Sequence, residues 1–165
     1  MTGLDTNILV RFFAKDDPIQ GVAAKEFLRT LSVESPGFVS LVALIERVWV
    51  LRSRYQLHKA DLILCVERLL DLPELIGEWQ TAVAQALTRF SMAKTDFADC
   101  LIERSGHLAG CKHTVTFDVN AAKTSGMKLL LLLSSLCTLR HQFANRLIIR
   151  INPPLRDQAV LHKRA

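Results

Sequence analysis

Short apolar segments alternate with longer amphipathic ones along residues 1–133. The amphipathic segment 58–72 places apolar side chains at i, i+3, i+4, i+7 and i+8, the spacing of one helix face. These side chains are Leu62, Cys65, Val66, Leu69 and Leu70. Further helices are predicted over residues 8–13, 21–31, 42–54, 79–90 and 96–108. A first strand is predicted to end at residues 3–5, others lie at 38–39 and 75–76, and buried strands are expected at 114–117 and 128–133.

The order of these segments predicts the fold class. Strands separated by helical segments of ten or more residues pair in parallel through crossovers, so we expect an α/β protein, an α/β/α sandwich with a central parallel sheet. In such open sheets ligands bind at the carboxyl ends of the strands. Candidate site residues should therefore directly follow the strands or lie in the helices that come after them.

Size and composition fit one globular domain with an apolar core. The chain has 165 residues, half of them hydrophobic. No secretory signal pattern opens it, and the longest apolar run, LLLLLSSLCTL, is shorter than the ~20 residues that a membrane span needs. We therefore expect a cytoplasmic location. The four cysteines contain no CxxC pair, which favours reduced and mostly buried thiols.

The net charge of +5 belongs to the end of the chain. Residues 1–133 carry equal numbers of basic and acidic side chains, 15 each, whereas residues 134–165 carry six basic side chains and one acidic one, Asp157. The end of the chain is thus either an arm that binds phosphates without specificity or a solvated terminus. We divide the sequence into a domain at 1–133 and a basic extension at 134–165.

Four carboxylates stand among apolar residues. They are Asp5 in GLDTNILV, Glu46 in LVALIERVWVL, Asp99 in DFADCLI and Asp118 in VTFDV. Asp5 and Asp118 are expected at strand ends, Asp99 in a first helical turn and Glu46 about two turns into a helix. In a doubly wound sheet these positions can converge on one edge.

Each carboxylate also has an ordinary structural role open to it. Asp5 can accept backbone N–H groups at a helix start, Asp118 can form an Asx turn, and Asp96 and Asp99 suit the N-terminus of a helix. Glu46 fits such a role less well, because a carboxylate on the apolar side of a helix is costly to bury alone.

A divalent cation would explain the four carboxylates together. Inward-facing carboxylates repel one another and raise each other's pKa values unless a cation neutralises them. Oxygen ligands favour Mg²⁺ or Mn²⁺ over zinc, and ordinary packing is the better interpretation of the nearby His107, Cys111 and His113. A bound ion of this kind can activate water for attack on a phosphodiester.

Four separated motifs resemble the PIN-domain ribonucleases, and most closely the VapC toxins of toxin–antitoxin pairs. These motifs are LDTNILVRF, GFVSLVALIERVWVLRSRYQL, DFADCLI and TFDVNAAKTSGMKLL, and the similarity covers residues 1–133. The resemblance implies a Mg²⁺- or Mn²⁺-dependent endoribonuclease with an RNA substrate. It also implies a small antitoxin protein as partner, and a homodimer.

The resemblance places the acidic metal site on Asp5, Glu46, Asp99 and Asp118. Asp96 would be an auxiliary acid, and Asn7 and Thr116 would orient the carboxylates through hydrogen bonds. Arg47 departs from the family pattern, and we expect it either to face solvent or to pair with an acid. Residues 134–165 have no counterpart in the compact toxins.

Two alternatives remain open. A phosphatase could use Asp5 as a nucleophile, although such sites use a DxD pair and this sequence reads Asp5-Thr6-Asn7. A non-catalytic binding module would use the same acids only as helix caps.

Overall fold

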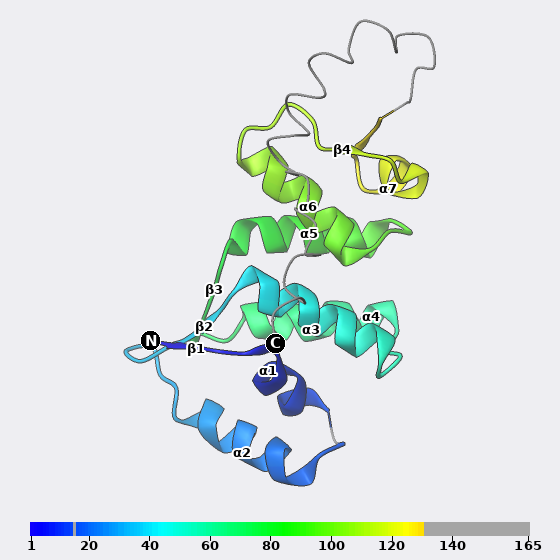
Figure 1. Ribbon diagram of the computed structural model, residues 1–165. Helices are drawn as coiled ribbons and strands as arrows, with labels where there is room; N and C mark the ends of the chain where they lie inside the picture. Colours follow the sequence, from blue (N-terminus) through cyan, green and yellow to red (C-terminus); the bar gives the residue numbers. More distant parts are fainter. Residues whose placement is uncertain (15, 131–165) are drawn as a thin grey trace, which may run out of the picture. The chain divides into compact units, whose positions relative to one another are not determined.

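The computed structural model describes residues 1–14 and 16–130. Five short strands and seven helices alternate in this part of the chain (Figure 1). The strands are β1 (Thr2–Gly3), β2 (Gly37–Val39), β3 (Leu75–Gly77), β4 (Val115–Thr116) and β5 (Lys128–Leu129). The helices are α1 (Thr6–Phe13), α2 (Pro18–Arg29), α3 (Leu41–Ser53), α4 (Lys59–Leu70), α5 (Gln80–Met92), α6 (Phe97–Leu108) and α7 (Val119–Thr124). The α/β class with a parallel sheet flanked by helices is confirmed.

Strands β1, β2 and β3 form a parallel sheet with β2 in the middle. Thr2 pairs with Gly37, and Gly37 pairs in turn with Leu75. All three strands run the same way, so their carboxyl ends meet at one edge. Asp5, Ser40 and Glu78 follow β1, β2 and β3 at that edge.

Strands β4 and β5 pair with each other in a second parallel sheet, so the described strands are divided between two sheets. We expected buried strands at 114–117 and 128–133, and this prediction is wrong for the described residues. In the first segment Val115 is 56% and Phe117 66% exposed, and in the second Leu130 is 46% exposed. The expectation for residues 131–133 lies outside the described part. Helix α7 was missed by the sequence interpretation.

Local sequence explains where the helices begin. Ser40 caps α3 by accepting a hydrogen bond from the backbone N–H of Ala43 at 3.2 Å. Asp17 caps α2 through the N–H of Gln20, and Pro18 stands at the first helical position, where no N–H is needed. At the start of α5, Trp79 adopts a left-handed backbone with φ of 55°.

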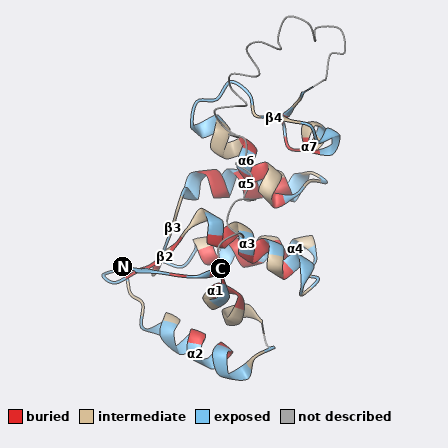
Figure 2. Cartoon of the chain, viewed as in Figure 1, coloured by how far each residue is buried: buried red, intermediate tan, exposed pale blue. Residues whose placement is uncertain are grey.

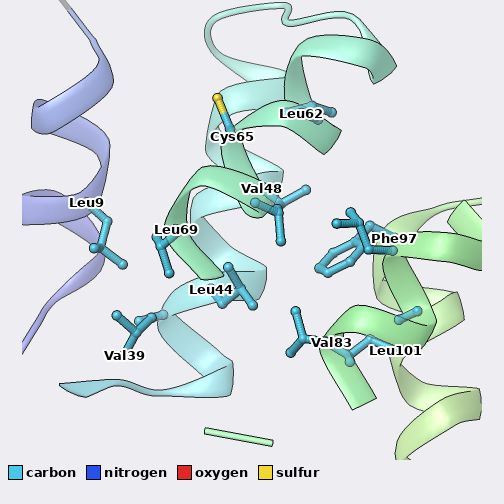
Figure 3. Close-up of a cluster of buried hydrophobic side chains, with 14 of the residues drawn as sticks. Leu9, Val39, Leu44, Val48, Leu62, Cys65, Leu69, Val83, Phe97 and Leu101 are labelled. Carbon is cyan, nitrogen blue, oxygen red and sulfur yellow. The ribbon is translucent and has the colours of Figure 1, made fainter. Parts of the chain in front are cut away.

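A cluster of buried hydrophobic side chains joins the three-stranded sheet to helices α1, α3, α4, α5 and α6 (Figure 2). Leu9, Val39, Leu44, Leu69 and Val83 come from α1, β2, α3, α4 and α5 and belong to this cluster (Figure 3). Helices α5 and α6 pack side by side (Figure 1). The core packs against α1 and α6, whose N-terminal ends carry Asp5, Asp96 and Asp99.

Among the cysteines, Cys65 and Cys100 are buried and Cys111 is exposed, all as free thiols. The prediction of mostly buried thiols therefore fits two of these three, and Cys137 lies outside the described residues. None of the described helices combines the length and apolar character needed to span a bilayer. The predicted extension at 134–165 also lies outside the described residues, so the boundary at residue 133 stays a prediction.

Candidate active site

Asp5 caps helix α1 directly after β1. One oxygen of its carboxylate, Oδ2, accepts a hydrogen bond from the Asn7 backbone N–H at 3.2 Å and another from the Asn7 side-chain amide at 3.0 Å. Asn7 thus holds the Asp5 carboxylate within the cap, and its predicted role at a metal site stays a prediction. Both residues are exposed, so the carboxylate remains accessible to a ligand.

Glu46 is linked to the start of α1 by a hydrogen bond. The buried Thr6 hydroxyl donates to Glu46 Oε2 at 2.6 Å, which joins α3 to the residue next to Asp5. We expected Glu46 on the apolar side of its helix, and this expectation is wrong because Glu46 is exposed. Its carboxylate therefore faces the surface and avoids the cost of burial.

Arg47 is the buried charge of α3, with 0% of its surface exposed. Its Nη1 donates to the Cys65 backbone carbonyl at 3.2 Å, and its guanidinium lies over the Phe13 ring, 4.2 Å from the centroid. Both expected placements, in solvent or against an acid, are thus wrong for the residues that the structure describes. Burial lowers the pKa of Arg47 to about 10, so it remains charged at neutral pH.

Asp96, Asp99 and Asp118 form an acidic group around the start of α6. Burial raises the pKa of the Asp99 carboxyl, and the negative charges of Asp96 and Asp118 raise it further. Asp96 caps α6 through the Ala98 N–H at 3.0 Å. Three predicted acids that are up to 22 positions apart in the sequence thus lie near enough for their charges to interact.

Asp118 caps α7 by accepting from the backbone N–H groups of Asn120 and Ala121 at 2.6 and 3.1 Å. The Thr116 hydroxyl accepts a hydrogen bond from the Asp118 backbone N–H at 3.0 Å and so contacts the main chain of Asp118 and not its carboxylate. The predicted role of Thr116 in orienting a carboxylate stays a prediction. Asp118 is therefore a helix cap and not only the end of a strand.

Two cavities share Glu46. The first, of about 330 Å³, is lined by Glu46, Trp49, Arg52 and Asp96 among mostly apolar residues. The second, of about 350 Å³, is lined by Thr6, Asn7, Glu46, Trp49 and Arg54 among others. Glu46 therefore lies beside Thr6 and Asn7 at the start of α1 and beside Asp96, the cap of α6. Asp5, Asp99 and Asp118 line neither of these two cavities.

The candidate carboxylates fit a hard divalent cation in their chemistry. All the donors are oxygens, and the like charges around Asp99 are what a cation would neutralise. Across residues 1–14 and 16–130, however, no three His, Cys, Asp or Glu side chains lie close enough to hold one ion. The four-carboxylate site thus stays a prediction.

Sequence reasoning missed two polar contacts at this edge. Glu78, which follows β3, accepts a hydrogen bond from the Leu41 backbone N–H at 2.8 Å and so holds the start of α3. Arg52 pairs with Asp96 at 2.5 Å, which ties α3 to the start of α6. The position of Glu78 directly after a strand is a sequence signal for its contact with Leu41. The pair of Arg52 and Asp96 joins distant segments, and no sequence signal predicts it.

A comparison with protein-family models matches residues 4–127 to the PIN domain. Because the match covers most of the 165 residues, this chain belongs to the PIN-domain family. PIN domains are generally nucleases that require metal ions. A comparison with curated proteins found no match.

Proposed function

We propose that this protein is a Mg²⁺- or Mn²⁺-dependent endoribonuclease whose metal is held by Asp5, Glu46, Asp99 and Asp118. The observation that carries the proposal is the group of like charges around Asp99 in a chain of the PIN family. A divalent ion there would lower the pKa of a bound water and neutralise negative charge on the scissile phosphate.

The chain's own residues would then hold and orient the carboxylates. Asn7 holds Asp5, Thr6 holds Glu46, and the Asp118 cap is held by Thr116. Asp96 would act as an auxiliary acid whose charge is partly neutralised by Arg52. The hydrogen bonds from Asn7 and Thr6 end on carboxylate oxygens and would fix the direction in which Asp5 and Glu46 present them.

The resemblance to VapC toxins supports a finer proposal. The nuclease would be the toxin of a toxin–antitoxin pair, acting on RNA in the cytoplasm, forming a homodimer and neutralised by a small antitoxin protein. The motif LDTNILVRF and the three motifs after it support this assignment.

The first test is cleavage of a structured RNA by the purified full chain. We expect cleavage with Mg²⁺ or Mn²⁺, none with a chelator, and a loss of at least about 100-fold in Asp5→Asn and in Asp99→Asn, because each substitution removes a charged ligand. Asp61→Asn is the matched control. Like Asp99, Asp61 follows its helix cap by three residues, and its side chain is exposed outside the candidate site.

Activity in Asp99→Asn equal to that of Asp61→Asn would exclude Asp99 from the site. Circular dichroism of each variant checks that the fold is retained, so that a loss of cleavage can be assigned to the missing carboxylate.

A second candidate is a non-catalytic PIN-like binding module. It is favoured by two findings: Asp5, Asp96 and Asp118 serve as helix caps, and no three acids of the described residues lie close enough to hold one ion. Such a module would bind RNA without cutting it, and Mn²⁺ would not raise its melting temperature.

A further inference from the structure

Trp49 is an exposed aromatic side chain beside the proposed active site. It lies in α3 with 65% of its surface exposed, three residues after Glu46. Residues three apart on a helix are neighbours on its surface. Trp49 and Glu46 both line each of the two cavities described above.

Exposing an indole in this way costs free energy unless something covers it. The walls of the first cavity are largely apolar, with Val42 on the same helix 74% exposed. The surface around Trp49 thus offers a flat ring and apolar walls next to a carboxylate.

Cationic groups surround the same surface. Arg52 lines the first cavity, and Arg11 and Arg54 line the second. Arg52 forms an ion pair with Asp96, and Arg11 forms one with Asp16. Arg54 is exposed. Arginine side chains bind phosphate groups, and an exposed tryptophan beside them can stack on a base. The two features together fit a single-stranded nucleic acid.

We propose that Trp49 is a stacking platform for an unpaired base of the RNA, which places the adjoining phosphate beside Glu46. This inference rests on the proposed nuclease function and names how its substrate is held. Trp49 is a positioning residue, because it acts on the base and not on the reacting atoms. RNA recognition commonly uses such stacking of unpaired bases on aromatic side chains.

The chain offers a clean spectroscopic test because it has only two tryptophans. Trp79→Phe leaves Trp49 as the sole indole, and Trp49→Phe leaves Trp79, which is 51% exposed and lines neither of the two cavities. The probe is a short single-stranded oligoadenylate, added to the full-length protein with a chelator present and at low salt. We expect it to quench most of the Trp49 emission and little of the Trp79 emission.

An abasic oligomer with the same number of phosphates is the matched ligand control, and it should quench neither tryptophan. Trp49→Ala should weaken oligoadenylate binding roughly five- to 150-fold, the range expected for one lost stacking contact. Trp49→Phe should recover most of the affinity. Trp79→Asn should leave it unchanged, because Asn suits the left-handed backbone at that position.

The outcomes separate this inference from the nuclease proposal. Quenching without RNA cleavage by the full chain would keep the stacking platform and overturn the nuclease. Cleavage without quenching of Trp49, or equal quenching by the abasic oligomer, would overturn the stacking platform. A blue shift of Trp49 with protein concentration alone would also overturn it, since a second copy of the chain would then cover the indole.

Discussion

At the scale of single residues, Arg47 is a buried charge whose hydrogen-bond donors are incompletely paired among the described residues, which lowers the stability of the fold. Its Nε and Nη2 atoms are buried, and neither has a hydrogen-bond partner within residues 1–14 and 16–130. We expect Arg47→Met to raise the free energy of unfolding by about 1 kcal/mol, because an apolar side chain of similar length keeps the packing and removes an incompletely paired buried charge. Urea denaturation measures this difference.

Arg47→Ala is the control for packing. It should destabilise the protein, because it leaves a cavity beside Phe13 and Cys65. Destabilisation by both Arg47→Met and Arg47→Ala would contradict the account, since it would show that the guanidinium makes favourable contacts that an apolar chain cannot replace.

A second residue-scale prediction concerns Asp16. The Tyr55 hydroxyl donates to Asp16 at 2.5 Å and lowers the pKa of this carboxyl, and Arg11 lowers it further. A lowered pKa in the folded state adds stability above the unfolded pKa of about 4, and that stability is lost as the pH falls through the folded pKa. Wild type should therefore lose melting temperature more steeply than Asp16→Asn as the pH falls below about 4.

Asp71→Asn, which alters an exposed carboxylate at the end of α4, serves as control and should follow the wild-type curve. Parallel curves for wild type and Asp16→Asn would show that Tyr55 and Arg11 do not stabilise the charged form.

Glu46 and Arg47 show a limit of sequence reasoning at this scale. The helix α3 itself was predicted correctly, but the prediction of which of these two residues faces inward was wrong. The apolar side chains of α3 lie on both its exposed and its buried sides: Val42 and Trp49 are exposed, and Ala43 and Val48 are buried. Such a helix has no polar face from which its rotation can be read.

At the scale of elements, β2 lies in the middle of its sheet and depends on Gly37. A Cβ atom at Gly37 would lie 2.9 Å from a methyl group of Leu31, 2.9 Å from one of Leu75 and 3.0 Å from one of Leu4. We expect Gly37→Ala to lower the free energy of unfolding by about 1 kcal/mol, because the leucine side chains must shift in a packed site. Chemical denaturation measures the change.

Gly3→Ala in β1 is the matched control. No atom lies within 4 Å of its added Cβ, so the substitution should be neutral or slightly stabilising. Equal stability of the two variants would show that Gly37 is not closely packed.

Elements with strong local signals were predicted well. The predicted helices at 58–72 and 96–108 correspond to α4 and α6 within two residues at each end, because apolar period and capping residues are both local. Helix α7 was missed because six residues are too few to show a period, and its cap Asp118 was interpreted as a strand end.

At the scale of the whole molecule, the alternation of strands and helices in the sequence predicted the fold class. The same pattern does not predict which side chains from distant segments contact one another. The contacts between Thr6 and Glu46 and between Arg52 and Asp96 span 40 and 44 residues. Such contacts depend on how helices pack, which no local pattern determines. The shared metal site is therefore the part of the account that most needs measurement.

Titration of the full-length protein with Mn²⁺, followed by the electron paramagnetic resonance signal of the free ion, tests this claim most directly. The account predicts that wild type and Asp61→Asn remove Mn²⁺ from solution equally, whereas Asp5→Asn and Asp99→Asn bind it about 10- to 100-fold more weakly. Equal Mn²⁺ binding by all four proteins, or none by the wild type, would contradict the claim that these carboxylates hold one divalent ion.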